Sequence, residues 1–301
     1  ESNKDYAVFL PSISGFYNTF ISKQQHGEYV PKDRIPAEFE HGVEGCNFLN
    51  ADKGYFNYKW SLYSAGHAQL DIAKSDVEES MVQKRDKQKT WCLADSGGFQ
   101  IGKGIINFDW ENFYEKPGDT NYIGNADAVR SKILNWLEHT ADYALVLDIP
   151  SWAADPVNRK RTKMSSYAET LKATLYNNDW FVKHRQGNVK FLNALHGMDW
   201  ASATEWYNAV KHFPFEGWAF GSNNMRNIYL ALRRMIVLRD DKLLEKGQND
   251  VIHFLGTSRL DWACMLTTIQ RCLREHVNED MTVTFDCASP FIATAHGQMY
   301  T

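Results

Sequence analysis

The stretch "TWCLADSGGFQ" at residues 90–100 joins a short apolar run to a glycine turn and places one acid, Asp95, between them. An apolar and aromatic run of this length is typical of a strand that is covered on both faces, and Gly97 and Gly98 end it abruptly. A carboxylate at the end of a buried strand has to be paired, solvated or used in chemistry. We therefore take Asp95 as the first candidate functional residue.

Other short apolar runs resemble this strand, and segments with helical spacing lie between them. The predicted strands are residues 6–11, 90–96, 143–150, 189–197, 217–222, 251–256 and 281–287, and the predicted helices are 127–141, 164–178, 203–213, 225–246 and 259–276. This alternation indicates a parallel α/β protein, and seven or eight such units in 301 residues predict a (β/α)8 barrel of the TIM type. A doubly wound open sheet is the alternative, but no GxGxxG motif follows the first run.

The repeat of strand and helix runs through most of the chain without a linker that would divide it. We therefore expect residues 1–301 to form a single catalytic barrel domain. Residues 12–89 do not follow the repeat, and the aromatic and glycine content of "GYFNYKWSLYSAGH" (54–67) predicts an elaborated N-terminal loop or hairpin region.

Composition narrows the classes of protein that are open. No apolar run approaches the roughly 20 residues that cross a bilayer, and no cationic segment followed by an apolar one opens the sequence, so we expect a cytoplasmic protein without a membrane partner. The five cysteines are spread out and form no CxxC pair, which suits a reducing compartment. The net charge of −4 means that a nucleic acid would have to be held by local basic patches.

Several predicted strands end in residues that can carry chemistry, namely Asp95, Asp148, His196 and Asp286. The carboxyl ends of barrel strands converge on one mouth, where active sites of this fold are built. We therefore expect three carboxylates and an imidazole to face one pocket. The structural alternative is that each aspartate only caps the helix that follows it.

At these positions the sequence resembles the tRNA-guanine transglycosylases. The motifs "ADSGGFQ" (94–100) and "FDCASPFIATAHG" (285–297) are similar to the two signatures of that family. Four shorter stretches between them resemble family segments in the same order: "LVLDIP" (145–150), "LHG" (195–197), "EGWAFGS" (216–222) and "HFLGTS" (253–258). The resemblance covers residues 90–297, which is most of the chain.

The resemblance implies a barrel enzyme, a pentosyltransferase that exchanges a base at a nucleoside by double displacement. Asp286 would be the nucleophile that attacks C1′ and forms a covalent glycosyl-enzyme, as the carboxylate of a retaining glycosidase does. Asp95 would be the general acid and base for the leaving and entering bases. Asp148 would accept hydrogen bonds from the N1 and N2 edge of a guanine-like base, which discriminates against adenine.

The resemblance also implies a binding pocket for the base. The incoming base would be a 7-deazaguanine such as 7-cyano-7-deazaguanine. His196 stands where the family has a glutamine that contacts O6 of the base. The remaining pocket residues would be Ser96 and Gly97, through close backbone approach, the backbone at Gly217 and Trp218, and Leu255 packed on the face of the base.

The second signature departs from the family at two positions. Ile292 and Ala295 replace two arginines that in the tRNA enzymes grip the bases beside the target. A subgroup of the superfamily, carried by phages and bacterial modification islands, inserts 7-deazaguanines into DNA. We therefore expect DNA as the substrate, with tRNA as the alternative and with the target guanine flipped out or unpaired.

Two basic runs are candidates for phosphate contacts, and we expect both beside the mouth. The run "NRKRTK" (158–163) supplies Arg159, Lys160, Arg161 and Lys163, and the run "KRDKQK" (84–89) precedes the Asp95 strand. Trp110, Trp152 and Trp218 are candidates for stacking on a flipped base or its neighbours, although core packing is the alternative role for each.

Other functions stay open at this stage. An inactive nucleic-acid-binding subunit would not need both Asp95 and Asp286, and a metal-dependent hydrolase would need clustered histidines such as HxH at a strand end, which the sequence lacks. The family's CxCxxC…H zinc element is absent, so no cofactor is expected unless a C-terminal segment or an atypical site binds zinc. Cys287 with His296 would make a thiol site, but adjacent strand residues point to opposite faces. The oligomeric state is left open.

Overall fold

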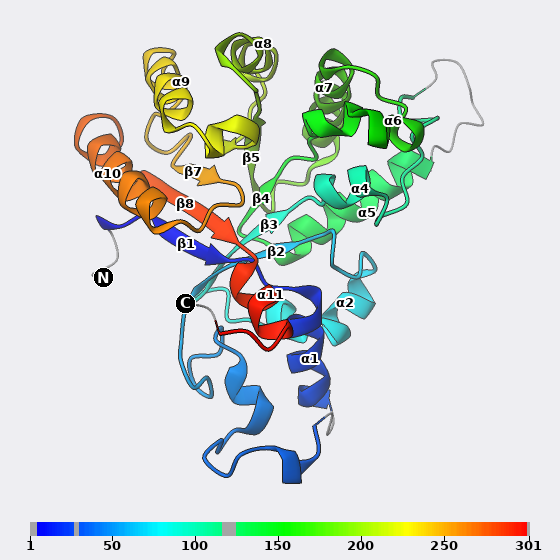
Figure 1. Cartoon of the computed structure of the whole chain (residues 1–301), viewed down its shortest axis with the longest axis vertical. Helices are drawn as coiled ribbons and strands as arrows, with labels where there is room; N and C mark the ends of the chain where they lie inside the picture. Colours follow the sequence, from blue (N-terminus) through cyan, green and yellow to red (C-terminus); the bar gives the residue numbers. More distant parts are fainter. Residues whose placement is uncertain (1–4, 27–29, 116–124, 300–301) are drawn as a thin grey trace.

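The computed structural model describes residues 5–26, 30–115 and 125–299, and its strands form a nearly closed parallel barrel (Figure 1). The strand order is β1-β8-β7-β6-β5-β4-β3-β2, and a parallel bridge between Ser12 and Leu62 brings the two edge strands together. The strands are β1 Val8–Pro11, β2 Trp60–Ser64, β3 Trp91–Asp95, β4 Tyr143–Leu145, β5 Lys190–Leu195, β6 Gly217–Phe220, β7 Val251–Phe254 and β8 Thr282–Cys287. The predicted (β/α)8 fold of the TIM type is confirmed.

Helices surround the strands and connect them (Figure 1). The α-helices are α1 Gly15–His26, α2 Ile72–Glu78, α3 Ser80–Gln83, α4 Gly98–Lys103, α5 Asn125–Thr140, α6 Pro156–Thr162, α7 Tyr167–His184, α8 Trp200–Val210, α9 Ile228–Asp240, α10 Leu260–His276 and α11 Ser289–Ala295. Short 3-10 turns are η2 Lys32–Arg34, η3 Gly42–Cys46, η4 Ser151–Ala154 and η5 Ser222–Met225. The five predicted helices correspond to α5, α7, α8, α9 and α10.

Leucines fill the inside of the barrel, which is therefore a packed core and not a channel. The interior cluster consists of Val8, Leu10, Leu62, Leu93, Leu145, Leu192, Ala219 and Val251. Aromatic rings close its amino-terminal end, because Trp91 packs between Trp60, with ring centroids 5.4 Å apart, and Tyr143, at 5.6 Å. Within the barrel itself, side chains that can meet a ligand are thus confined to the carboxyl-terminal mouth.

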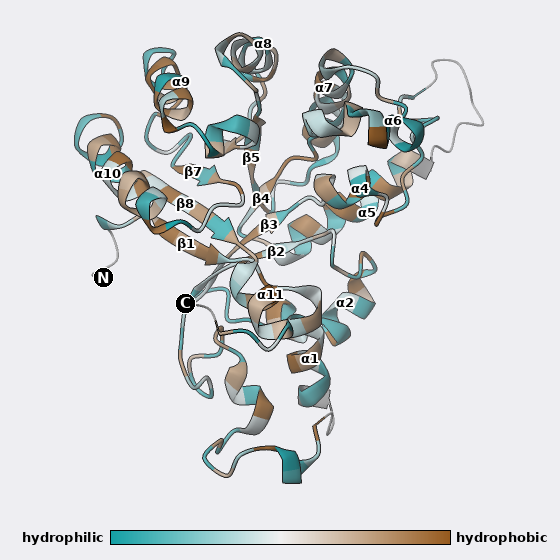
Figure 2. Cartoon of the chain, in the orientation of Figure 1, coloured by the Kyte–Doolittle hydropathy of each residue, from teal (hydrophilic) through white to brown (hydrophobic). Residues whose placement is uncertain are grey.

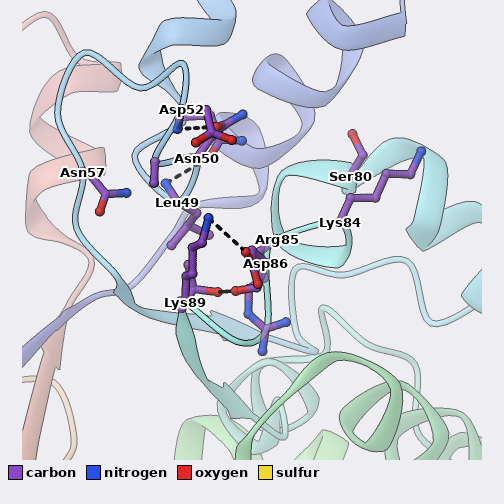
Figure 3. Close-up of a pocket in the computed structure, with 12 residues that line it drawn as sticks. Leu49, Asn50, Asp52, Asn57, Ser80, Lys84, Arg85, Asp86 and Lys89 are labelled. Carbon is purple, nitrogen blue, oxygen red and sulfur yellow. Dashed lines mark hydrogen bonds and ion pairs between the residues drawn. The ribbon is translucent and has the colours of Figure 1, made fainter.

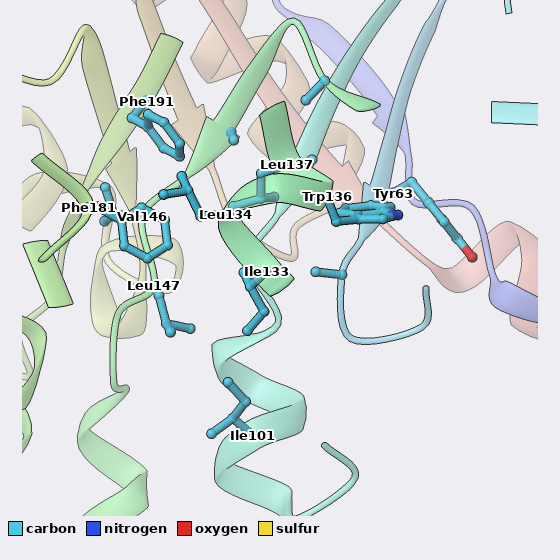
Figure 4. Packing of buried hydrophobic residues seen from close by; sticks show 14 of the residues in the cluster. Tyr63, Ile101, Ile133, Leu134, Trp136, Leu137, Val146, Leu147, Phe181 and Phe191 are labelled. Atoms are coloured by element: carbon cyan, nitrogen blue, oxygen red, sulfur yellow. The ribbon is translucent and has the colours of Figure 1, made fainter. Parts of the chain in front are cut away.

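A second apolar layer lies between the strands and the helices. Figure 4 shows Leu134 of α5 near Val146 and Phe191, and Trp136 of the same helix beside Tyr63. In Figure 2 the strands are mostly apolar, whereas the surrounding helices carry both apolar and polar residues, as expected of helices with one buried face. The two apolar layers fix the strands and hence the positions of the residues at their ends.

The region 12–89 differs from the prediction of a loop or hairpin. It contains β2, which pairs in parallel with β3 and so is no hairpin partner, together with α1, α2 and α3. The sequence "WSLYS" of β2 hides the strand because two serines interrupt the apolar pattern, yet Ser61 and Ser64 are both buried. The eighth barrel strand was therefore inside the segment assigned to an insertion.

The leucine interior predicts the cost of a cavity at the centre of the barrel. Leu93→Ala removes a fully buried side chain, and we expect it to lower the free energy of unfolding by about 2–5 kcal/mol. Leu260→Ala is the matched control, since Leu260 is 79% exposed, and should change it by less than about 0.5 kcal/mol. Urea denaturation measures both, and equal effects would contradict a packed interior.

Candidate active site

The barrel brings three carboxylates together at its carboxyl-terminal mouth. Asp95 is the last residue of β3, Asp286 lies near the end of β8, and Asp148 follows β4 by three residues. The pKa of Asp95 is raised to about 6, chiefly by loss of hydration and also by the negative charges of Asp148 and Asp286, against the opposing hydrogen bond from Ser64. Asp95 therefore exchanges a proton near neutral pH.

Asp95 is oriented by the neighbouring strand. Ser64, the last residue of β2, donates a hydrogen bond of 2.6 Å to Oδ2 of Asp95, and its own Oγ accepts one of 3.0 Å from the backbone N–H of Gly66. Ser64 is a functional residue that the sequence reasoning missed, because β2 was not predicted. Ser64 pairs in register with Asp95 once β2 and β3 are aligned in parallel, and this pairing would have identified it.

Asp148 is held by a chain of hydrogen bonds across three strand ends. His196 Nε2 lies 2.7 Å from Asp148 Oδ2, and His196 Nδ1 lies 2.8 Å from Ser222 Oγ. Asp148 and His196 are both buried. Since a carboxylate only accepts, Nε2–H donates to Asp148 and the Ser222 hydroxyl satisfies Nδ1. Among the described residues, none donates a hydrogen bond to Oδ1 of Asp148.

This chain changes the role expected for His196. Both ring nitrogens are engaged within the protein, so neither is free to contact O6 of a base as predicted. Its ring is also confined, because a Cβ atom at Gly221 would lie 2.8 Å from Cε1 of His196. The glutamine of the family is therefore not replaced by an equivalent donor, and His196 instead positions Asp148.

Asp286 has two unlike oxygens. Oδ1 accepts a hydrogen bond of 2.7 Å from the backbone N–H of Gly256, and His253 Nε2 lies 3.2 Å from the same oxygen. Within the described ranges, no residue donates a hydrogen bond to Oδ2. The Asp286 side chain is 12% exposed, so it is largely buried at the mouth. Asp286 is thus fixed by one oxygen and open at the other.

Three of the remaining predicted pocket residues lie at the mouth. Ser96 is buried and donates from Oγ to the carbonyl of Val146 at 2.9 Å, so its side chain ties β3 to the segment after β4. Gly97 precedes α4 with φ +83°, where a side chain would be strained. Leu255 is half-buried against the barrel interior and packs beside Gly221. The geometry is compatible with the predicted roles of Gly97 and Leu255.

Gly217 and Trp218 do not lie at the mouth, in contrast to the prediction. Gly217 begins β6 and pairs with Val251 at the amino end of β7, whereas the mouth end of the strand is Phe220. The indole of Trp218 is buried in the outer layer and donates to the carbonyl of Leu243 at 2.8 Å. The backbone that approaches the pocket from this strand is Gly221.

The basic run of residues 158–163 lies on the mouth side, because α6 follows the end of β4. Arg159, Lys160, Arg161 and Lys163 are all exposed. Arg161 is partly committed, since its guanidinium donates to the carbonyl of Gly102, and Lys163 Nζ lies 3.4 Å from Glu111. Arg159 donates from Nε to the carbonyl of Ala154 at 2.7 Å. Its terminal nitrogens and the Lys160 ammonium are the better placed groups for a phosphate partner.

The basic run of residues 84–89 lies at the opposite end of the barrel and does not adjoin the mouth as predicted. It precedes Trp91, the first residue of β3, whereas Asp95 is the last. Its side chains line a separate cavity of about 220 Å³ (Figure 3). Arg85 is buried there and pairs with Asp142 at 2.7 Å. The strand direction therefore excludes this run from the candidate site.

An aromatic pair with a cation stands beside the mouth. Phe99 of α4 is 53% exposed, and its ring centroid lies 5.3 Å from that of Trp152 in η4. Lys103 Nζ lies 4.8 Å from the Trp152 ring. Trp110, by contrast, is buried among Phe108 and other rings and is a core residue, as is Trp218. Phe99 was not among the residues predicted from the sequence. The exposure of its ring, directly after Gly98, is what identifies it in the structure.

Comparisons with protein-family models and with curated proteins find no match to the chain. Among the residues that the structure describes, no group of three or more His, Cys, Asp and Glu side chains is placed to hold a metal ion. None of the helices in the described ranges is both long and apolar enough to cross a membrane. The function of the site therefore has to be inferred from its own residues.

The raised pKa of Asp95 predicts that its ionised form lowers the free energy of unfolding, and that this effect depends on pH. The folded state binds this proton more tightly than the unfolded state, so the stability contributed by Asp95 falls as pH rises from about 4 to about 6. Asp95→Asn removes the charge and should raise the free energy of unfolding by on the order of 2–3 kcal/mol at pH 7.5. The gain should vanish toward pH 4.

Urea denaturation of both proteins at pH 4, 6 and 7.5 measures this difference. Ser64→Ala serves as the opposite control, because it leaves the ionised Asp95 without its hydroxyl donor and should lower stability at pH 7.5. A difference between Asp95→Asn and the unsubstituted protein that does not depend on pH would contradict the raised pKa.

Proposed function

We propose that this protein is a base-exchange transglycosylase, a pentosyltransferase that replaces guanine in DNA with a 7-deazaguanine through a covalent glycosyl-aspartate. The observation that carries the proposal is the difference between two acids in one mouth: Asp286 has a fixed oxygen and an open one, and Asp95 has a pKa of about 6. A nucleophile and a separate proton carrier are what double displacement requires.

In the first step Oδ2 of Asp286 attacks C1′ of the target nucleotide. The bond from Oδ2 to C1′ forms, the bond from C1′ to N9 breaks, and its electron pair leaves with the guanine. Protonated Asp95 supplies a proton to the departing base. The result is a covalent glycosyl-enzyme, a neutral guanine and an ionised Asp95.

In the second step the incoming 7-deazaguanine gives its N9 proton to ionised Asp95. N9 then attacks C1′, and the bond from C1′ to Oδ2 breaks to restore the Asp286 carboxylate. Asp95 ends protonated, as it began. Because the folded-state pKa of Asp95 is about 6, both of its forms are accessible at neutral pH, which favours a group that has to give and take a proton in one cycle.

Asp148 is the base-reading residue of this proposal. Its free Oδ1 is available to accept from N1–H or N2–H of a guanine-like base while His196 holds Oδ2. A base that presents no donor to this oxygen leaves a buried carboxylate unsatisfied, which is the physical basis of discrimination against adenine.

DNA is the proposed polymer, and cytoplasmic action, in a bacterial host for a phage-encoded enzyme, is part of the proposal. The exposed ring of Phe99 beside Trp152 and Lys103 offers a stacking surface with a cation at the mouth. Helix α11 carries Ile292 and Ala295 where the tRNA enzymes carry arginines, which argues against a grip on the anticodon loop. The guanine would be unpaired or flipped out to reach the mouth.

The test is incorporation of labelled guanine or 7-cyano-7-deazaguanine into duplex DNA, single-stranded DNA and unmodified tRNA in parallel at one salt concentration. We expect label in DNA. Asp286→Asn should lower exchange by roughly 10³-fold or more and abolish a denaturation-stable adduct. Asp95→Asn should slow exchange by roughly 10²–10⁴-fold and still allow the adduct. Label in tRNA alone would overturn DNA as substrate, and full exchange by Asp286→Asn would overturn the mechanism.

Binding to DNA should depend on the basic run at the mouth and not on the one at the opposite end. The double substitution Arg159→Ala and Lys160→Ala should weaken binding and reduce the slope of log K against log salt by about 1–2. Arg161 is left intact because its guanidinium is bonded to Gly102. Lys84→Ala with Lys89→Ala is the matched control with the same charge change. Equal slopes for both double variants would remove residues 158–163 from the interface.

A further inference from the structure

We propose that His253 is a positioning residue for Asp286, which holds Oδ1 of the carboxylate so that Oδ2 is the oxygen that reacts. The inference rests on the proposed function for its catalytic meaning, although the pairing itself is a property of the folded protein. His253 lies in β7, below the mouth. It is the first residue of the resembling stretch "HFLGTS" (253–258), but the predicted site did not include it.

The first observation is the place of the imidazole. His253 is fully buried, and its Nε2 lies 3.2 Å from Oδ1 of Asp286. The Nε2–H direction does not point squarely at that oxygen, so the contact is electrostatic and no linear hydrogen bond forms; Nε2 has no other partner among the described residues. A buried ring nitrogen with this one polar neighbour is otherwise a cost to the fold.

The second observation is the anchor on the other side of the ring. Nδ1 of His253 lies 2.8 Å from Oγ1 of Thr284, and that hydroxyl lies 3.4 Å from the carbonyl of Ile252. The ring is thus fixed by β8, the strand that also carries Asp286. The Thr284 hydroxyl can donate to Nδ1, which places the ring proton on Nε2. The opposite tautomer would turn an Nε2 lone pair toward the carboxylate of Asp286, so the geometry favours a proton on Nε2.

The third observation is that the backbone N–H of Gly256 binds the same oxygen. The hydrogen bond from Gly256 and the electrostatic contact of His253 Nε2 therefore both fall on Oδ1, and among the described residues Oδ2 has no donor. When the bond from C1′ to Oδ2 breaks in the second step, the returning carboxylate charge is stabilised by groups that are already in place. Preorganised donors of this kind act on the transition state without moving.

The test compares two substitutions of the same class. In His253→Gln the side-chain amide reaches the position of Nε2 and can donate to Asp286, whereas in His253→Asn the shorter amide lies near Thr284 and cannot. We expect the rate of adduct formation to fall by roughly tenfold or more in His253→Asn and to stay within about threefold of the parent in His253→Gln. KM for the free base should be unchanged in both, because His253 does not touch the base.

An equal loss in both variants would assign His253 a merely structural role, and no loss in either would overturn the proposal. A second measurement stands apart from activity. In protein labelled with [15N]histidine, the His253 signals are identified by their absence in His253→Gln. Asp286→Asn should shift the Nε2 signal by several ppm and leave Nδ1 nearly unmoved, as judged against Asp95→Asn as control. An unmoved Nε2 signal would overturn the pairing, whereas a shifted signal in a protein that exchanges no base would overturn only the transglycosylase function.

Discussion

Keeping three carboxylates in one poorly hydrated mouth is the constraint on which the rest of this structure depends. Loss of water and the negative charges of Asp148 and Asp286 destabilise the ionised form of Asp95. The barrel answers with a separate donor for each: the Ser64 hydroxyl for Asp95, the imidazole of His196 for Asp148, and the N–H of Gly256 for Asp286. Each donor comes from the neighbouring strand or a loop beside it. The register of the sheet therefore determines whether each carboxylate has the donor that stabilises it in the folded protein.

The same constraint explains why small residues and leucines stand where they do. A Cβ atom at Gly98 would lie 2.4 Å from the carbonyl oxygen of Asp148, and one at Gly221 would press on His196, so close packing of the loops depends on glycine there. Below the mouth, the leucine interior and the Trp60–Trp91–Tyr143 rings exclude water from the other end. The acids therefore meet solvent and ligand from one side only.

The sequence was sufficient for the barrel and for the convergence of Asp95, Asp148 and Asp286, because apolar runs and the acids that follow them are local signals. It was insufficient where the outcome depends on pairing. The serines of β2 look polar until a partner strand buries them, which hid Ser64. Gly217 and Trp218 were expected in the base pocket from the resemblance of "EGWAFGS", which does not show that Gly217 pairs at the amino end of β6. His253 reads as one more strand residue until Thr284 and Asp286 are seen on the strand beside it.

The three acids also differ in the kind of group that stabilises each of them. Asp148 and Asp286 each have an imidazole nitrogen within 3.2 Å, which can offset a negative charge, whereas Asp95 has only the hydroxyl of Ser64 and the backbone near Gly97. Burial and the negative charges of Asp148 and Asp286 raise the pKa of Asp95, which therefore takes up a proton near neutral pH. The proposed proton carrier and the proposed nucleophile thus draw their donors from different places in the sheet, the end of β2 for Asp95 and the end of β7 for Asp286.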